Sequence, residues 1–166
     1  MGKKQVGEVV YKVQYVPLEL KLIQLDKKGA MSEPLYTQYK NDRKHYVEFL
    51  LQVSIPNFGE EFLKYETSES SYESRLDYYS FQFKNDIRFI FDQKDTVLCD
   101  EFIFERNFGI SPNASFVIGT SITKKYSQIS VLVNDRVLSD RKVIFDFSNK
   151  DIKKLPSLKK YNKWKK

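Results

Sequence analysis

The sequence has a single cysteine, Cys99, and a single histidine, His45. One cysteine excludes an intramolecular disulfide, and one histidine excludes every zinc site that needs two or three imidazole ligands. The six glycines are scattered, so no dinucleotide-binding or Walker-type phosphate-binding loop is present. No apolar run approaches the length of about 20 residues that a transmembrane helix needs. These absences exclude many catalytic and cofactor-binding classes.

Aromatic and β-branched residues, by contrast, are plentiful and recur with a period of two. Phenylalanine, tyrosine and tryptophan make up 15% of the 166 residues. From Val47 to Ile55 every second residue is apolar, and those between are polar except Leu50. On a β-strand this alternation directs one set of side chains into the core and the other towards water. Similar runs begin at Val9, Tyr79, Ile87, Phe102, Phe116, Ile129 and Val143.

Polar breaks separate these runs. At 84–86, 92–95 and 134–136 they contain Asn or Asp, which tolerate the positive φ of tight hairpin turns. Pro17 removes a hydrogen-bond donor from the first run and predicts a bulge, a corner or an edge there. About eight or nine short strands with little strong helix are typical of an antiparallel sandwich or barrel.

We therefore predict an all-β fold. Residues 1–156 are expected to form a single antiparallel β-sandwich, of immunoglobulin-like or jelly-roll style, with a short C-terminal helix. That helix is predicted to follow Ser148, because Ser148 or Asn149 can cap it and Pro156 stops it. Residues 157–166 are expected to form a basic, flexible tail.

Two stretches depart from the strand pattern. Residues 27–45 are polar, and Ser32 before Glu-Pro is a favourable helix start, so a short helix and an ordered loop both fit. Within 56–75, residues 60–65 fit one or two helical turns. Residues 66–74 are rich in Ser, Glu and Thr, and we predict a flexible loop there. The interpretation we favour is that this loop is a crossover between the two sheets.

The titratable residues do not form a convincing catalytic or metal-binding motif. Cys99 and His45 would have to meet to act as nucleophile and base, but Cys99 is expected inside a strand over 97–106, and His45 at a strand entry. Two acidic clusters are interpreted as solvated rims rather than as a calcium or glycosidase site: Asp92, Asp95, Asp100 and Glu101, and Glu60, Glu61, Glu66, Glu69 and Glu73. We expect no enzyme activity, no catalytic or metal site and no cofactor.

The predicted contact surface is a pair of loops, 56–76 and 106–114, at one end of the sandwich. The candidate partner-contact residues are Phe58, Tyr65, Tyr72, Arg106 and Phe108. The Arg106 guanidinium can bind an anion through two parallel N–H donors. The interpretation we favour is that Arg106 pairs with a nearby acid and thereby holds the loop in place. An alternative is a carbohydrate- or small-ligand-binding domain that stacks its ligand on exposed tyrosines such as Tyr72, Tyr78 or Tyr161.

The positive charge is concentrated near the C-terminus. The formal net charge is +6, yet residues 141–166 hold ten basic and two acidic residues, for +8, whereas the remainder holds 18 basic and 20 acidic residues, for −2. Candidate contacts of this tail with an anionic membrane or nucleic acid are Lys159, Lys160, Lys163, Trp164, Lys165 and Lys166. We favour a solubilising terminus, and nucleic acid is the least expected partner because no nucleic-acid-binding module is recognisable.

The most specific local sequence runs from Cys99 to Pro112, followed by residues 116–119. This segment resembles uncharacterised secreted or lipid-anchored proteins of Bacteroidetes-type bacteria. The resemblance implies export, a periplasmic or outer-membrane-associated location, and a lipid anchor upstream of Met1. It carries no known activity, so no functional residue is transferred.

The function we expect is that of a non-enzymatic exported binding or structural module. It would contact a protein or an envelope component through loops or an exposed edge strand. The alternatives are the ligand-binding domain described above and a cytoplasmic protein whose tail binds nucleic acid or membrane.

Overall fold

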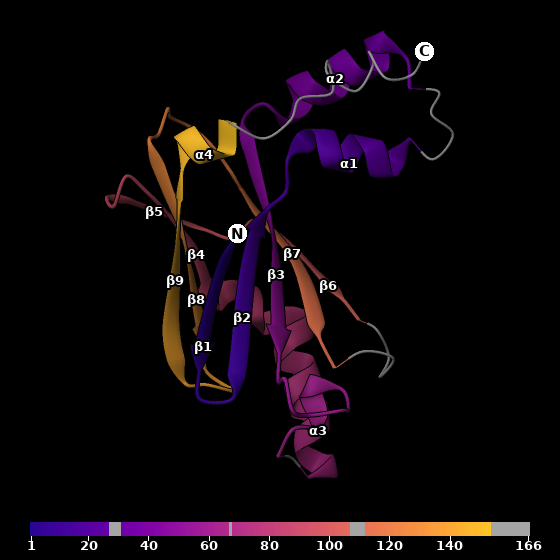
Figure 1. Ribbon diagram of the computed structural model, residues 1–166, viewed down its shortest axis with the longest axis vertical. Coiled ribbons are helices and arrows are strands. Elements are labelled where there is room, and N and C mark those ends of the chain that lie inside the picture. The colour runs from indigo at the N-terminus through magenta and orange to yellow at the C-terminus, as the bar shows by residue number, and fades with distance from the viewer. Residues whose placement is uncertain (27–30, 67, 107–111, 154–166) are drawn as a thin grey trace.

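The computed structural model describes residues 1–26, 31–66, 68–106 and 112–153. Within these ranges nine strands form two antiparallel sheets (Figure 1). One sheet has the order β1 (Gly2–Val6), β2 (Val9–Tyr15), β3 (Tyr46–Ser54), β7 (Ala114–Ser121), β6 (Glu101–Glu105). The other has the order β5 (Asp95–Leu98), β4 (Ile87–Phe91), β8 (Gln128–Asp135), β9 (Arg141–Ser148). The predicted all-β sandwich is confirmed.

The core lies between the two sheets and is rich in aromatic rings. The ring of Phe49 on β3 lies 5.9 Å from that of Phe89 on β4 and 4.9 Å from that of Phe147 on β9, measured between centroids. On β3 the alternate residues Val47, Phe49, Leu51 and Val53 are all buried. The period of two therefore does mark the residues that hold the sheets together by apolar burial.

The predicted turn at 92–95 joins β4 to β5. Asp92 and Gln93 have φ angles of 49° and 60°, and the Lys94 N–H donates to the Phe91 carbonyl at 3.0 Å, so a tight turn with positive φ lies within the three-residue connection 92–94. Asp92 Oδ1 also accepts hydrogen bonds from the backbone N–H groups of Ser127 and Gln128, at 2.8 and 3.0 Å. One of the predicted acidic residues thus serves to anchor a turn.

Two helices lie at one end of the sandwich. Helix α1 (Leu18–Leu25) begins directly after Pro17, where the chain leaves β2. Helix α2 (Glu33–Arg43) begins after Ser32, whose Oγ accepts a hydrogen bond from the Leu35 N–H at 3.4 Å. The helical interpretation of residues 27–45 is therefore confirmed for their described part.

The predicted loop over 66–74 and the predicted strand at 79–83 are both wrong. Helix α3 (Glu69–Asp77) continues into a π-helical turn, η2 (Tyr78–Gln82), and a 3₁₀ turn, η3 (Phe83–Asp86). Tyr79 and Phe83 are buried four residues apart, whereas Phe81 between them is 69% exposed. This spacing places the two rings on one helical face. The 3₁₀ turn η1 (Phe62–Lys64) confirms a helical turn within 60–65.

The strand predicted over 97–106 is also wrong. Strand β5 ends at Leu98 and β6 begins at Glu101, and these strands belong to different sheets. Cys99 and Asp100 therefore form the crossover between sheets.

Helix α4 (Asn149–Lys153) follows β9 directly, as predicted, although it precedes the last 13 residues of the chain. The tail predicted over 157–166, with its six candidate contact residues, lies outside the described residues. Across the described ranges, no helix combines the length and apolar character needed to cross a membrane.

Candidate functional site: a basic groove at the helical end

Four of the five predicted partner-contact residues are among the described residues, and they form two pairs whose members contact each other. The rings of Phe58 and Tyr65 pack edge to face with centroids 5.3 Å apart. Tyr72 donates a hydrogen bond to Glu61 at 2.9 Å and accepts one from Arg106 Nη2 at 2.8 Å.

Arg106 Nε also lies 3.8 Å from Glu61 Oε1. These contacts match the interpretation in which the arginine pairs with an acid and pins a loop. Phe108 lies outside the described residues.

Several residues of the predicted acidic clusters make local contacts. Asp100 Oδ2 accepts hydrogen bonds from the Ser121 N–H and Oγ at 3.0 and 2.9 Å, and Glu61 is held by Tyr72. Among the described residues, no group of three or more His, Cys, Asp or Glu side chains is placed to hold a metal ion.

Cys99 and His45 differ in environment. Cys99 is buried, its Sγ donates to the Glu101 carbonyl at 3.0 Å, and burial raises the pKa of its thiol to about 11. A thiol with that pKa is almost fully protonated at neutral pH, and the protonated form is a poor nucleophile. His45 is exposed immediately before β3.

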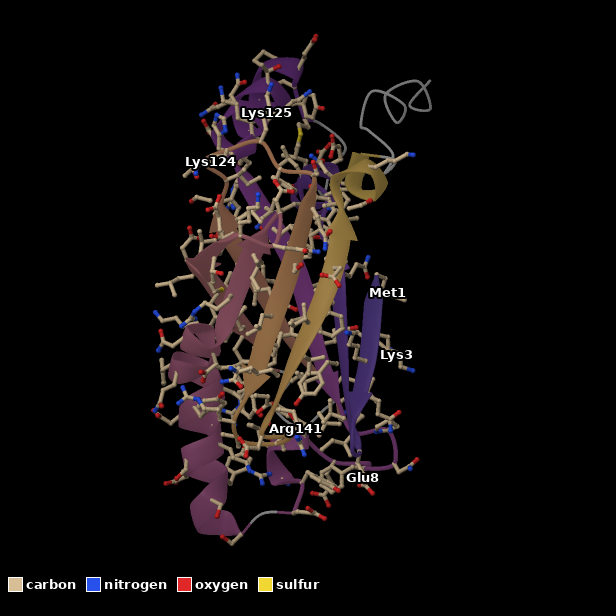
Figure 2. The ribbon with its side chains drawn as sticks, turned by 90° about the vertical axis from the view of Figure 1, so that its left-hand side faces the viewer. Met1, Lys3, Glu8, Lys124, Lys125 and Arg141 are labelled. Atoms are coloured by element: carbon tan, nitrogen blue, oxygen red, sulfur yellow. The ribbon has the colours of Figure 1, made fainter. Side chains whose placement is uncertain are left out.

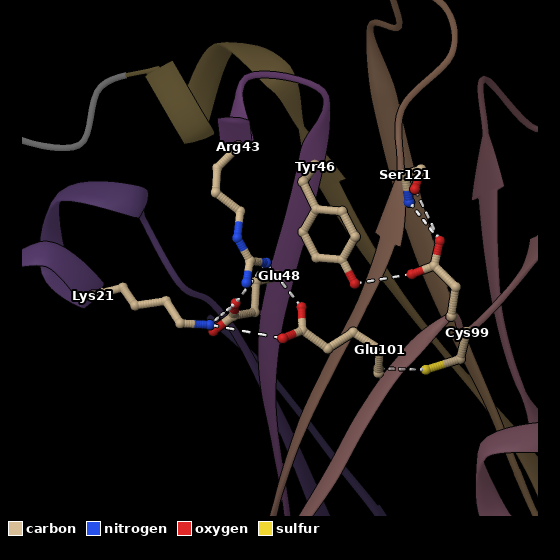
Figure 3. Close-up of polar contacts among 8 residues, drawn as sticks. Lys21, Arg43, Tyr46, Glu48, Cys99, Glu101 and Ser121 are labelled. Carbon is tan, nitrogen blue, oxygen red and sulfur yellow. Dashed lines mark hydrogen bonds and ion pairs between the residues drawn. The ribbon is translucent and has the colours of Figure 1, made fainter. Parts of the chain in front are cut away.

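Four charged side chains hold helices α1 and α2 against the outer face of the five-stranded sheet (Figure 3). Lys21 of α1 pairs with Glu48 of β3, and its Nζ lies 3.8 Å from Glu101 Oε1 of β6. Arg43 of α2 lies 3.0 Å from Glu101 Oε2 and 3.8 Å from Glu48 Oε2. We call these four residues the ion-pair network; it joins both helices to two strands.

The strand register explains why the two glutamates meet. Gly119 of β7 is paired with Glu48 on one side and with Glu101 on the other. A Cβ at Gly119 would lie 2.7 Å from the Tyr46 ring and 2.8 Å from the Val47 carbonyl oxygen. The missing side chain leaves room for Tyr46, whose hydroxyl donates to Asp100 Oδ1 at 2.8 Å and whose ring lies 4.9 Å from the Arg43 guanidinium.

Charge, rather than apolar burial, dominates the attachment of the helices. On α2 no described residue is buried, and on α1 the buried apolar residue is Leu22. Burial opposes ionisation of Glu101, but hydrogen bonds from Arg43 and Tyr46 and the nearby Lys21 charge outweigh it and lower the pKa of Glu101. Glu101 therefore stays ionised at neutral pH.

Beside the helices lies a groove of about 710 Å³, the basic groove. It is lined by residues from four segments: Tyr15, Leu18 and Glu19; Lys40 and 43–47; 122–126; and Asn149 and Ile152. Its cations are Lys40, Arg43, Lys44, Lys124 and Lys125, against one acid, Glu19. Figure 2 shows Lys124 and Lys125 at the end of the molecule where the two helices lie.

Two tyrosines contribute hydroxyl groups to the basic groove. Tyr15 and Tyr126 both line it, and neither hydroxyl makes a hydrogen bond within the described ranges. Burial raises the pKa of Tyr15 to about 12, and the pKa of Tyr126 is raised by the same cause. Both hydroxyls therefore remain protonated at neutral pH and are available as hydrogen-bond donors.

The net charge of the chain gave no indication of the basic groove. Residues 1–140 sum to −2, so the clusters at 40–44 and 124–125 cancel against acids elsewhere. The sequence did contain one usable signal. Residues 40–44 lie directly before the strand pattern that begins at Val47, and residues 124–125 follow the pattern that begins at Phe116. Tyr46 of β3 is paired with Ser121 of β7, and this pairing brings the two clusters side by side.

A scan against protein-family models gives no match, and no curated protein or solved structure is found to be similar to the chain. Inference about function therefore depends on the chemistry of the residues described above.

Proposed function

We propose that the protein is a non-enzymatic binding module that engages an anionic partner, a protein or an envelope component, at the basic groove. The observation that carries this proposal is the composition of the groove: five cations and one acid line it together with apolar residues such as Leu18 and Ile122. Like charges gathered around a concave apolar surface attract a ligand of opposite charge and exclude ligands of the same charge.

The chemistry of the groove supports binding rather than catalysis. Its described side chains include lysines, an arginine and neutral tyrosines, which are suited to holding an anion. The thiol of Cys99 is protonated and bonded to a backbone carbonyl. We also propose, from the resemblance of residues 99–112, that the protein is exported to the periplasm or outer membrane.

Of the tyrosines considered for carbohydrate stacking, Tyr72 and Tyr78 are less suited to that role, and Tyr161 lies outside the described residues. Tyr78 is buried and donates to Asp86 at 2.9 Å, and Tyr72 bridges Glu61 and Arg106. A stacking platform needs an accessible ring face. The basic groove therefore has better support as a binding surface.

The proposal is tested by measuring the binding of three anionic probes to the full-length chain: polyglutamate, a heparin fragment and vesicles containing phosphatidylglycerol. The groove variant Lys124→Glu/Lys125→Glu is compared with a matched variant of exposed lysines elsewhere, Lys3→Glu/Lys84→Glu. We expect the groove variant to lose about ten-fold or more in affinity for at least one probe, and the matched variant to lose about two-fold or less.

A third variant, with the tail lysines 159, 160, 163, 165 and 166 replaced by Gln, separates the tail from the groove. Equal losses in the groove and matched variants, or a loss confined to the tail variant, would show that the groove is not the binding surface.

A further inference from the structure

We infer that the partner at the basic groove is an acidic segment of another protein that inserts an apolar side chain between flanking carboxylates. This inference rests on the proposed function and adds the chemical class of the partner. Its basis is the composition of the groove, where apolar side chains and cations from different segments of the chain line one concave surface.

The basic groove combines apolar and charged side chains. Leu18, Ile122 and Ile152 contribute apolar surface, and the cations come from the end of α2 and from the 122–126 loop. An apolar centre within a charged rim, enriched in tyrosine and arginine, is the anatomy of an energetically important protein–protein contact. A partner with a central apolar anchor and acids on both sides is complementary to this pattern.

The hydroxyls of Tyr15 and Tyr126 also suit an acidic partner. Both remain protonated and are free to donate to a ligand, as described above. Both tyrosines line the same groove. Neutral O–H donors at such a surface can donate hydrogen bonds to a carboxylate of the partner.

The packing of the aromatic rings in the groove favours a protein partner over a nucleic acid. Proteins that bind single strands stack bases on open aromatic faces. Here Tyr15 packs against Phe49, Tyr126 packs against Phe91, and Tyr46 lies under Arg43. Glu19 on the groove would also repel a continuous phosphate chain, whereas a peptide can place its acids away from it.

The shape and size of the groove also suit a peptide segment. A volume of about 710 Å³ lies within the range of about 300–1,000 Å³ typical of sites that enclose a compact ligand. A concave site of this size accommodates a few side chains of an extended segment, and a flat membrane surface does not enter it.

Two of the cations of the basic groove already have acidic partners within the protein. Arg43 belongs to the ion-pair network, and Lys124 lies 3.6 Å from the exposed Asp95. Lys40, Lys44 and Lys125 are therefore expected to provide most of the attraction, and a bound carboxylate would compete with Asp95 for Lys124.

The experiment measures fluorescence anisotropy of labelled peptides with the full-length protein. The test peptides carry Leu, Phe or Trp flanked on each side by two glutamates. The control peptides carry Gly at the centre, or Gln in place of every Glu. Further probes are a single-stranded oligonucleotide and phosphatidylglycerol vesicles. We expect at least one test peptide to bind about ten-fold more tightly than either control peptide.

Two protein variants report on the hydroxyl donors. Tyr15→Phe/Tyr126→Phe keeps both rings, and we expect it to lose about five-fold or more in affinity for the test peptide. The matched variant Tyr39→Phe, on the exposed part of α2, is expected to bind as the wild type does.

The inference is overturned if the glycine peptide binds as tightly as the anchored ones, if no test peptide binds, or if the oligonucleotide or the vesicles bind more tightly than every peptide. The proposed function survives these outcomes if Lys124→Glu/Lys125→Glu still weakens another anionic probe. It fails with the inference if that variant weakens none.

Discussion

The two ends of the sandwich stabilise a buried carboxylate in opposite ways. At the end away from α1 and α2, Asp135 is 0% exposed and accepts hydrogen bonds from Tyr11 at 2.7 Å and Tyr79 at 2.9 Å. The backbone N–H groups of Val137 and Leu138 also donate to it, each at 3.0 Å. At the helical end, Glu48 is 9% exposed and is paired with the charged groups of Lys21 and Arg43.

The difference shows how each end responds to its surroundings. The donors to Asp135 are neutral in charge, and they come from β2, η2 and the turn after β8, so these bonds depend on geometry and tie three segments together. The partners of Glu48 are charged and partly exposed, so dissolved salt weakens them. We therefore expect the Asp135 end to be the more stable and the helices to be the part that conditions can release.

The largest effect is expected from removing the buried carboxylate. Asp135→Ala leaves the Tyr79 hydroxyl and two backbone N–H groups without their acceptor, and leaves the Tyr11 hydroxyl only Ser139 Oγ, at 3.0 Å, which should lower the free energy of unfolding by about 3 kcal/mol or more. Urea unfolding followed by circular dichroism measures this loss. The exposed Asp42→Ala is the control, and a loss below about 1 kcal/mol for Asp135→Ala would contradict the comparison.

A smaller loss is expected at the sheet surface beneath the helices. Gly119→Ala places a methyl group 2.7 Å from the Tyr46 ring and 2.8 Å from the Val47 carbonyl oxygen. We expect the free energy of unfolding to fall by about 1–3 kcal/mol, because the backbone oxygen cannot move aside as a side chain can. The control is Gly59→Ala, whose added Cβ meets no atom within 4 Å. Equal stability of the two variants would show that Tyr46 can be displaced without cost.

Neutralising the centre of the ion-pair network should have a still smaller effect on global stability. Glu48→Gln keeps the shape but removes the charge, and we expect a loss of about 1 kcal/mol that shrinks as sodium chloride is added. Hydrogen exchange should quicken in α1 and α2 but not in β8 or β9. Glu73→Gln on the exposed face of α3 is the control. A loss independent of salt would mean that packing, not charge, holds the helices.

The smallest effect is expected from acidification. The pKa of Glu101 is lower in the folded protein than its ordinary value, so its ion pair adds stability above the unfolded pKa of about 4.3. That contribution is lost as the pH falls through the folded pKa. The protection factors of the α2 amides, which are corrected for the intrinsic slowing of exchange in acid, should therefore fall below about pH 4 before those of β8 and β9 change. Simultaneous exposure of all elements would argue against separate behaviour of the two ends.

The strands were predictable because their signal is local. Alternating apolar residues from Val47 to Val53 require only a sheet with one face buried, and the turn at 92–95 requires only residues that accept positive φ. At 79–83 the same kind of signal failed. Rings at Tyr79 and Phe83 satisfy both a period of two and a helical spacing of four, and contacts with Phe62 and Phe116 accompany the helical arrangement.

The candidate site was less predictable because a side chain's availability depends on distant partners. Phe58, Tyr65, Tyr72 and Arg106 were singled out as partner contacts, but in the fold Phe58 packs against Tyr65, and Tyr72 and Arg106 contact each other and Glu61. Nothing near Arg106 in the sequence identifies Glu61 as its partner.

The sequence by itself determined the all-β class, the alternation of most strands, the turn at 92–95, and the absence of intramolecular disulfides and multi-histidine metal sites. Only the tertiary structure decided which charges became paired and which remained around a groove. Local alternation specifies the face that each side chain occupies, whereas the pairing of β3 with β7 brings 40–44 and 124–125 together from opposite parts of the chain. The electrostatic field of a site depends on such long-range neighbours, and one-dimensional patterns do not contain them.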